Sequence, residues 1–394
     1  MTRIYLDHNA TTPLREEVRR RWLEALERTG GNPSSLHRSG REARQFLDEA
    51  RERTAAALRV DEDEIHFTSG GTESNNLALF GALRGQGPSA GLVASAVEHS
   101  SVLAAAAQLE QEGHPLSLVG VDPHGLLDPG EVLDRAEADG ARLIAVMAAN
   151  NEVGVRMPLE EIGKGLDGLL PQSRPLLFTD AVQALGRVPL PLKAWNIDLA
   201  SFSAHKIGGP LGVGVLYRRA AVELRPLFFG GEQEGGLRPG TENVAAIVGA
   251  SYAVELAIRD REAFAAHAAK LAAGLWEALR EALPNARLLG PELTSAQRLP
   301  GTLNILLPNV DGKVLVTRLD LEGLELSAGS ACASGSLEPS HVLLAMGLDE
   351  GEARAGLRIS IGRDTTLREI REAVEILRKT AGRNDATREP RMGL

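Results

Sequence analysis

The chain has 394 residues, more than one hydrophobic core usually organises, so its length favours two domains. Lysine and arginine total 43 against 53 aspartate and glutamate, a formal net charge of -10, and the absence of a long basic run argues against direct nucleic-acid binding. No stretch reaches the roughly 18 apolar residues of a membrane span, and the start has no signal-peptide core. The single cysteine, Cys332, excludes an intramolecular disulfide framework. We therefore expect a soluble, cytoplasmic protein that does not bind a membrane.

Hydrophobic periodicity predicts alternating helices and strands. Apolar residues three and four apart predict helices over residues 14–28 and 39–58. Short apolar runs predict strands at residues 65–68, 91–96, 142–148, 175–179, 199–203 and 212–217. This alternation is typical of an α/β fold with a mostly parallel sheet.

The pattern changes in the last third of the chain. From about residue 243 it predicts one long Ala/Leu-rich helix, followed by shorter strands such as residues 303–307 and 357–361. We therefore predict a large domain over residues 16–254. A smaller α+β domain is predicted to combine residues 255–394 with residues 1–15.

Polar residues follow three of the predicted strands, where α/β sheets bind ligands. Gly71 allows close backbone approach, and Thr72 is expected to cap the next helix, whose start suits a phosphate. Asp180 follows residues 175–179, and Lys206 follows residues 199–203. Taken singly, these residues have ordinary explanations: a helix cap for the glycine turn and for Asp180, and a solvated surface charge for Lys206.

Together, the three features indicate pyridoxal 5'-phosphate (PLP). A glycine turn suits the phosphate, and a lysine that loses its proton can attack the cofactor's aldehyde. An acid earlier in the chain can keep the pyridine nitrogen protonated, so that the ring withdraws electrons. Asp180 and Lys206, 26 residues apart, match these two roles.

Motifs along nearly the whole chain resemble those of one enzyme family. They are YLDHNATTP (5–13), GNPSSLHRSG (31–40), FTSGGTESNN (67–76), EHSSV (98–102), NNEVG (150–154), DAVQALG (180–186), SFSAHKIGGPLGVG (201–214), RPGTEN (238–243), SAGSACASGSLEPSHVL (327–343) and LRISIGRDTT (357–366). In sequence and order they resemble the cysteine desulfurases of the NifS/IscS group. These are fold-type-I PLP enzymes of the class-V aminotransferase type, so the resemblance implies a large α/β domain and a smaller α+β domain.

The resemblance also implies a role for each matching residue. Lys206 is expected to hold the PLP aldehyde as a Schiff base, with Asp180 at the pyridine nitrogen, Gln183 at the phenolic oxygen and His99 stacked on the ring. The phosphate is expected to contact Gly71, Thr72, Ser203 and His205 of one subunit and Thr241 of the partner subunit, which implies a homodimer. Asn151 is expected near the ring and substrate, and Arg358 at the substrate carboxylate. No metal is expected.

Cys332 stands among small residues. A lone cysteine is most often a small buried hydrophobe, but SAGSACASGS contains no bulky apolar residue to bury it, which predicts a mobile loop carrying a reactive thiol. The thiolate is the nucleophile, and a histidine near the ring is a suitable proton carrier. By resemblance, Cys332 takes sulfur from L-cysteine, giving L-alanine and a persulfide. That sulfur is expected to pass to an acceptor protein, either an iron–sulfur scaffold or a transfer-RNA thiolation protein.

Two other PLP-based functions are compatible with the sequence. A selenocysteine lyase or another β-eliminating PLP enzyme of the same fold shares Lys206, Asp180 and His99 but need not use Cys332. A non-catalytic scaffold of this fold is favoured only if a core residue is missing, and none is. A nicotinamide-dinucleotide domain is excluded because the first predicted strand lacks the G-x-G-x-x-G that should follow it.

The chain departs from the family pattern at three positions near the lysine. Ala204 stands where the family often has glycine, and Gly208 and Leu211 stand where it has an aromatic and a basic residue. We expect these differences to retune the cofactor pocket and to leave its function intact.

Overall fold

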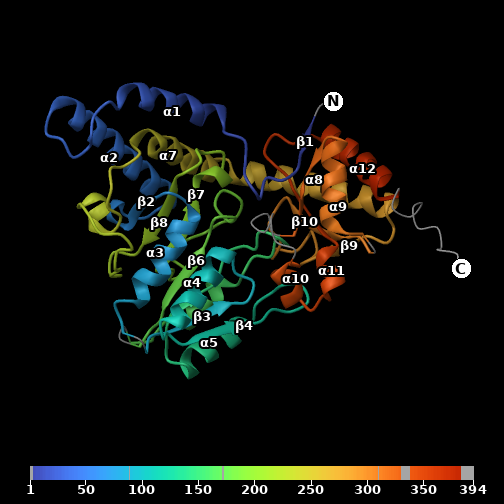
Figure 1. Ribbon diagram of the computed structural model, residues 1–394, viewed down its shortest axis with the longest axis horizontal. Coiled ribbons are helices and arrows are strands. Elements are labelled where there is room, and N and C mark those ends of the chain that lie inside the picture. The colour runs from blue at the N-terminus through green and yellow to red at the C-terminus, as the bar shows by residue number, and fades with distance from the viewer. Residues whose placement is uncertain (1–2, 88, 171–172, 309, 330–337, 383–394) are drawn as a thin grey trace, which may run out of the picture.

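The computed structural model describes residues 3–87, 89–170, 173–308, 310–329 and 338–382, and Figure 1 shows their arrangement in two lobes. The helices are α1 (Glu16–Arg28), α2 (Arg38–Leu58), α3 (Gly71–Leu83), α4 (Ser100–Gln111), α5 (Pro129–Ala138), α6 (Leu159–Gly165), α7 (Val244–Arg259), α8 (Arg261–Ala282), α9 (Gly312–Leu321), α10 (His341–Ala345), α11 (Glu350–Arg354) and α12 (Leu367–Gly382). The strands are β1 (Ile4–Tyr5), β2 (Ile65–Thr68), β3 (Gly91–Ser95), β4 (Leu116–Val119), β5 (Ala141–Ala145), β6 (Leu176–Asp180), β7 (Leu199–Ser203), β8 (Gly214–Arg218), β9 (Arg287–Leu289), β10 (Thr302–Leu306), β11 (Leu324–Glu325), β12 (Ser327–Ala328) and β13 (Gly356–Ser360). Short 3₁₀ turns are η1 (Glu62–Glu64), η2 (Ala204–Lys206) and η3 (Gln233–Gly236).

A seven-stranded sheet forms the large lobe, in the order β2-β8-β7-β6-β5-β3-β4. Neighbouring strands from β7 to β4 pair in parallel, whereas β8 runs antiparallel to both β7 and β2. The predicted mostly parallel α/β sheet is therefore confirmed. Because β2, β3, β5, β6 and β7 point the same way, their carboxyl ends meet at one edge of the sheet.

Alternate residues of these strands belong to two separate cores. On β5, Leu143 and Ala145 pack in the cluster that includes α3 and α4, and Ile144 packs in the cluster that includes α2, α5 and α7. The sheet is thus covered on both faces, which is why its strands appear in the sequence as continuous apolar runs.

The small lobe has a core of its own. Ile4 and Leu6 from the start of the chain pack with residues of α8, α9, α12, β10 and β13. Its sheet has the order β12-β13-β10-β9, and β1 pairs with β11. The N-terminal segment therefore leaves the small lobe at β1 and crosses to the large lobe at α1 (Figure 1).

The prediction of one long helix from about residue 243 is wrong, because the structure has two helices there, α7 and α8. They meet at Asp260, where ψ is 2° and the carboxylate accepts hydrogen bonds from Arg15 and Arg259. α7 packs against α1 and α2, whereas α8 packs in the small-lobe core. Sequence periodicity did not reveal the break because both helices are rich in alanine and other apolar residues.

The described residues meet the requirements of neither a membrane-spanning helix nor a metal site. None of the helices described is long and apolar enough for a membrane span. In the same part of the chain, no group of three or more His, Cys, Asp or Glu side chains is arranged to hold a metal ion.

Candidate active site

Lys206 lies in η2, directly after the fully buried strand β7. Its Nζ donates hydrogen bonds to the carbonyl oxygens of Asn9 and Ala10, at 2.7 and 2.6 Å. Thr12 fastens the same two segments together, because its hydroxyl donates to the carbonyl of His205 and accepts from the N–H of Gly208. The lysine therefore points at the N-terminal segment and is not a solvated surface charge.

Asp180 is the last residue of β6, the strand next to β7. Its side chain is 6% exposed; Oδ2 accepts from Asn75 Nδ2 at 2.8 Å and Oδ1 accepts from the N–H of Val182 at 3.0 Å. Asp180 pairs with Ser201, so the carboxylate leaves the sheet beside the end of β7. The fold thus brings the predicted acid and lysine to neighbouring strand ends.

Gln183 lies beside the lysine. Its Nε2 donates to the carbonyl oxygen of Asn9 at 3.0 Å, the same oxygen that accepts from Lys206 Nζ. Its Oε1 is buried and has no hydrogen-bond partner within the described part of the chain. A buried acceptor without a donor costs free energy, so Gln183 has an oxygen ready for a ligand that donates or for a shared proton.

His99 begins helix α4. Its Nδ1 accepts from the backbone N–H of Ser101 at 3.2 Å and lies 2.7 Å from the Ser101 hydroxyl. That hydroxyl also accepts from Asn75 Nδ2 at 2.8 Å, and the same nitrogen donates to Asp180. A chain of hydrogen bonds therefore joins His99 to Asp180, although 81 residues separate them in the sequence (180 minus 99).

The turn between β2 and α3 comes close to β7. A Cβ atom placed on Gly71 would lie 2.9 Å from Val182 Cγ2 and 3.7 Å from Ser203 Cβ. Thr72 was predicted to cap α3, and this is wrong: the N-cap is Gly70, and Thr72 is the second residue of the helix. Because no side chain in the described part of the chain caps α3, its first N–H groups remain available to an anion.

His205 adjoins the lysine and contacts the N-terminal segment, with Nδ1 3.0 Å from Thr11 Oγ1. Burial and then the positive charge of Lys206 lower the pKa of His205 to about 4. The imidazole is therefore neutral at pH 7. A neutral ring can donate one hydrogen bond to a phosphate without adding charge.

The departure at Gly208 has a structural reason. Its φ is +78°, and a Cβ atom there would lie 2.4 Å from Arg15 Cγ. An aromatic side chain at this position would have to displace Arg15, which pairs with Asp260 at 2.5 Å. In this chain Arg15 occupies the space next to the lysine turn.

Arg358 lies on β13 in the small lobe and is 1% exposed. Its Nη2 donates to Asp7 Oδ1 at 2.8 Å and to Ser327 Oγ at 3.2 Å, and its Nη1 donates to the carbonyl of Asn151 at 3.3 Å. The two residues predicted to bind substrate are thus in contact. Nε of Arg358 is buried and has no partner among the described residues.

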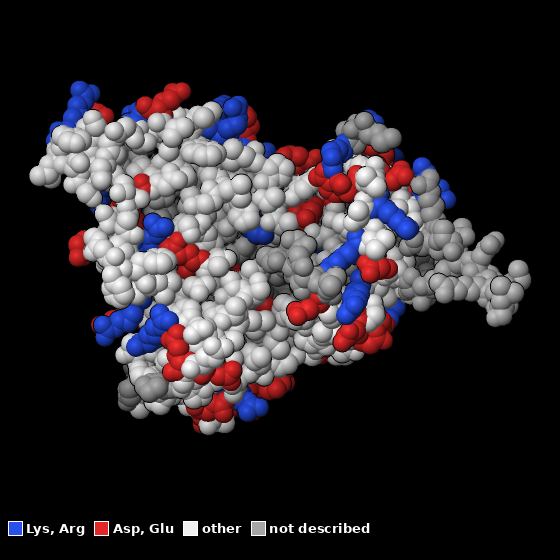
Figure 2. Space-filling view, in the orientation of Figure 1, with Lys and Arg blue, Asp and Glu red and all other residues white. Residues whose placement is uncertain are grey.

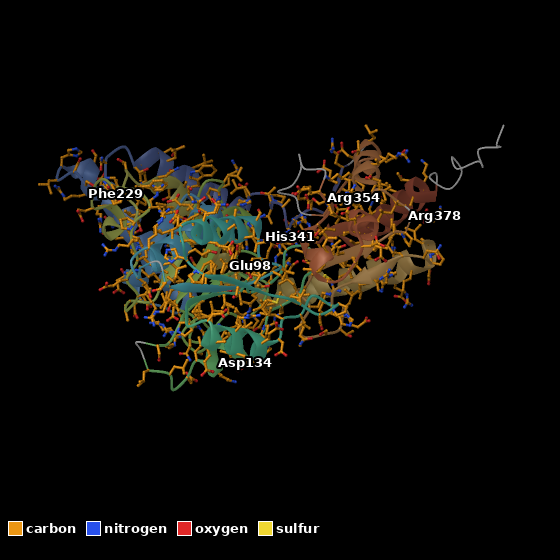
Figure 3. All side chains as sticks on the ribbon, turned by 60° about the horizontal axis from the view of Figure 1, so that its bottom comes forward. Glu98, Asp134, Phe229, His341, Arg354 and Arg378 are labelled. Atoms are coloured by element: carbon orange, nitrogen blue, oxygen red, sulfur yellow. The ribbon has the colours of Figure 1, made fainter. Side chains whose placement is uncertain are left out.

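The remaining two predicted residues are placed differently. Thr241 is exposed on the surface, two residues before the Asn243 side chain caps α7. Cys332 lies outside the described residues. Both flanks of its segment reach the site: Ser327 contacts Arg358, and His341 Nε2 lies 2.9 Å from the carbonyl oxygen of Glu98, next to His99. Figure 3 shows Glu98 and His341 close together.

A cavity of about 440 Å³ lies beside Lys206 but is not this site. Of the residues predicted to bind the cofactor, only Lys206 lines it. Its other walls come from the start of α1, the α7–α8 junction and residues 361–365. The strand-end cluster, where the polar groups converge, is the better candidate.

Sequence reasoning missed four residues of the site: Asp7, Asn9, Asn75 and Ser101. Asn9 is 1% exposed and contacts both lobes, because its Nδ2 donates to Asn151 and Thr302 and its Oδ1 accepts from Arg187. All four lie inside motifs quoted above. Their polarity was visible, but most of their partners are distant in sequence.

The sequence profile of the family described as aminotransferase class-V matches residues 4–372. That match covers most of the chain.

The chain belongs to the class-V aminotransferase family.

Within this family, the chain is 40% identical over 380 residues to the cysteine desulfurase IscS of Dictyoglomus turgidum, covering 95% of this chain and 94% of that protein. It is 41% identical over 378 residues to a cysteine desulfurase of Trichormus azollae, covering 96% and 92%. A solved NifS-like protein superposes with a TM-score of 0.89 at 35% identity, covering 97% of this chain and all of that one. The predicted resemblance to the NifS/IscS group is confirmed.

The residues of the site fit the cofactor of this family, PLP. Gly71 leaves a space that a Cβ would fill, between Val182 and Ser203 at the uncapped start of α3, which suits the phosphate. Gln183 Oε1, which has no partner among the described residues, suits a phenolic O–H that donates to it, and Asp180 suits a protonated ring nitrogen. A lysine amine at the neighbouring strand end suits the aldehyde.

Proposed function

We propose that this protein transfers sulfur from L-cysteine to Cys332 and that the strand-end cluster performs the chemistry. Its family and its relatives identify the enzyme as a PLP-dependent cysteine desulfurase. The observation that carries the site assignment is the convergence of Asp180, Lys206 and His99 at one edge of the sheet. One flank of the Cys332 segment contacts Glu98, next to His99, and the other contacts Arg358.

The residues around the cofactor have separate tasks. When bound, PLP supplies an aldehyde for the substrate amine and an electron-poor ring that weakens bonds at the substrate's α-carbon. Asp180 holds a proton at the ring nitrogen, Gln183 contacts the phenolic oxygen, and His99 covers the ring. The phosphate is held by Gly71, Thr72, Ser203 and His205.

Two further residues orient the substrate. Arg358 and Asn151 hold its carboxylate and neighbouring groups, because a guanidinium matches a carboxylate in shape and charge. Lys206 Nζ then removes the α-proton and later returns one. This assignment requires Lys206 to exchange its hydrogen bonds to Asn9 and Ala10 for the substrate.

The sulfur-transfer step needs only one thiol of the enzyme, that of Cys332. The thiolate of Cys332 attacks the substrate sulfur, an S–S bond forms, and the C–S bond breaks with its electron pair left on carbon. Protons from the site complete L-alanine, and Cys332 carries a persulfide. The net change is L-cysteine plus a thiol giving L-alanine plus a persulfide.

The persulfide must leave through another molecule, because the chain has no second cysteine to resolve it. We assign it to an acceptor protein, either an iron–sulfur scaffold or a transfer-RNA thiolation protein. A free thiol that must stay reduced also supports a cytoplasmic location.

A homodimer is part of this proposal. Phe228 and Phe229 are 56% and 90% exposed, and Leu211 is 74% exposed. A Cβ atom on Gly230 would lie 3.1 Å from Pro239 Cβ, so the phenylalanines adjoin the turn that carries Thr241. Exposed apolar side chains beside a residue expected at a neighbour's phosphate support pairing of two copies here.

The decisive experiment compares alanine formation and persulfide formation in three variants. Cys332→Ser should form no persulfide and no alanine above background, and Lys206→Ala should lose the cofactor's visible absorbance and all turnover. Lys164→Ala, which removes an exposed lysine paired with Glu160, serves as the control and should behave as wild type. Alanine production by Cys332→Ser at the wild-type rate would support a lyase that does not use this cysteine.

A further inference from the structure

His99 receives two hydrogen bonds at a single ring nitrogen. The backbone N–H of Ser101 donates to Nδ1 at 3.2 Å. A ring nitrogen that carries a proton cannot accept a hydrogen bond. Because Nδ1 accepts one, it must carry a lone pair and no proton. A neutral imidazole in this setting has its proton on Nε2.

The Ser101 hydroxyl reinforces the same assignment. Asn75 Nδ2 donates to Ser101 Oγ at 2.8 Å, so the hydroxyl accepts on that side and its one hydrogen is free to point at Nδ1, 2.7 Å away. The other hydrogen of Asn75 Nδ2 points at Asp180 Oδ2, an acceptor, at 2.8 Å. Asn75 is 1% exposed, so this direction of donation is shielded from water.

We propose that Asn75 and Ser101 are positioning residues that hold His99 as a neutral imidazole with its proton on Nε2. An imidazolium would place a proton on Nδ1 and lose the hydrogen bond from the Ser101 backbone N–H, because that N–H cannot accept. His99 therefore acts in the site as a neutral hydrogen-bond donor through Nε2, and in this tautomer it has no lone pair there to act as a base. The inference rests on the proposed place of His99 over the cofactor.

The ring proton can be located directly. The holoenzyme is labelled with ¹⁵N-histidine, and the His99 signals are identified by their loss in His99→Asn, a variant that retains a good helix N-cap. At pH 7.5 we expect one protonated nitrogen, assigned to Nε2 by its couplings to both ring carbon-bound protons, and one unprotonated nitrogen. An Nδ1-protonated ring or an imidazolium at this pH overturns the proposal.

Ser101→Ala tests the relay, by which we mean the hydrogen bonds that run from Asn75 through the Ser101 hydroxyl to His99 Nδ1. Ser100→Ala, at the exposed neighbouring residue, is the control. In Ser101→Ala the backbone N–H remains, so the Nε2 proton stays, but the Nδ1 resonance should move because one donor is gone. kcat should fall about fivefold, the worth of one hydrogen bond, with KM for cysteine unchanged. A Nδ1 resonance identical to that of Ser100→Ala contradicts the relay. This readout is independent of turnover in the Cys332 and Lys206 variants, so the two proposals can fail separately.

Discussion

At the scale of single residues, Asp7 holds Arg358, the residue proposed to bind the substrate carboxylate. A guanidinium that is 1% exposed needs a charged partner, and Asp7 Oδ1 at 2.8 Å supplies it. Ser327 bridges the pair, because its hydroxyl donates to Asp7 Oδ2 at 2.8 Å and accepts from Arg358. Together with the carbonyl oxygen of Asn151, these partners come from three different parts of the chain and fix the plane of the guanidinium group.

Arg358→Lys should show whether substrate binding depends on the positive charge of the side chain alone or also on the planar shape of the guanidinium. The lysine keeps the positive charge but cannot make contacts with Asp7, Ser327 and Asn151 at once. We expect the Kd of L-cysteine to rise about tenfold, and the Kd of cysteamine, which has no carboxylate, to change little. Titration of the cofactor absorbance with each amine measures both.

Arg354→Lys is the matched control for that measurement. Arg354 is an exposed arginine of α11 that pairs with Glu350, and Figure 3 shows it in the small lobe. Its substitution should leave both titrations unchanged. An equal loss of cysteine and cysteamine binding in Arg358→Lys would remove the carboxylate role from Arg358.

At the scale of elements, the antiparallel strand β8 shapes the turn that precedes α3. Gly214 pairs with Thr68, and a Cβ atom on Gly214 would lie 2.5 Å from the carbonyl carbon of Gly70. Only a glycine on β8 lets the β2–α3 turn pass this close. The position of Gly71, and hence of the helix start proposed to bind the phosphate, depends on it.

Gly214→Ala should therefore weaken both folding and cofactor retention. The added methyl meets backbone atoms that cannot move aside, so we expect the free energy of unfolding to fall by about 2 kcal/mol. Urea unfolding and PLP release in buffer measure the two effects.

Gly274→Ala is the contrasting variant. Gly274 lies within α8 with nothing within 4 Å of an added Cβ, so alanine should raise the free energy of unfolding by up to about 1 kcal/mol. Cofactor retention should stay as in wild type. If Gly214→Ala unfolds at the wild-type urea midpoint, the close packing of β8 on the turn does not constrain the site.

At the scale of the whole molecule, charged side chains are spread over the face shown in Figure 2, whereas the exposed phenylalanines Phe228 and Phe229 are adjacent. Figure 2 shows acidic and basic side chains interspersed over the face in view. In contrast, Figure 3 shows Phe229 at the end of the large lobe away from the small lobe. A phenylalanine that is 90% exposed is costly in water unless another surface covers it.

Phe229→Asp should weaken association of two copies. A charge buried at the proposed interface disfavours pairing, so we expect the solution mass to shift from two chains towards one. Cofactor content should fall as well, because the proposed contact of Thr241 with the neighbouring subunit's phosphate would be lost. Light scattering after size-exclusion chromatography measures the mass. Leu367→Asp is the control, since Leu367 is 48% exposed at the start of α12, where an acid is favourable. A wild-type mass for Phe229→Asp would place the interface elsewhere.

The sequence by itself determined the order of the elements and the chemistry of their ends. Strands buried on both faces are continuous apolar runs, so β2, β6 and β7 were predicted almost to the residue. Asp180 and Lys206 stood out as polar residues at or just beyond the ends of β6 and β7. These features are local: hydrophobic periodicity and the residue that follows it depend on a few neighbouring positions.

Only the tertiary structure decided which groups meet. Asn9 shares its carbonyl between Gln183 and Lys206, Asn75 joins His99 to Asp180, and Asp7 pairs with Arg358 across 351 residues. The break at Asp260 likewise depends on Arg15 from the other end of the chain. Such contacts are set by how two lobes pack around a strand-end edge, and a hydrogen bond between residues hundreds of positions apart leaves no periodic trace in the sequence.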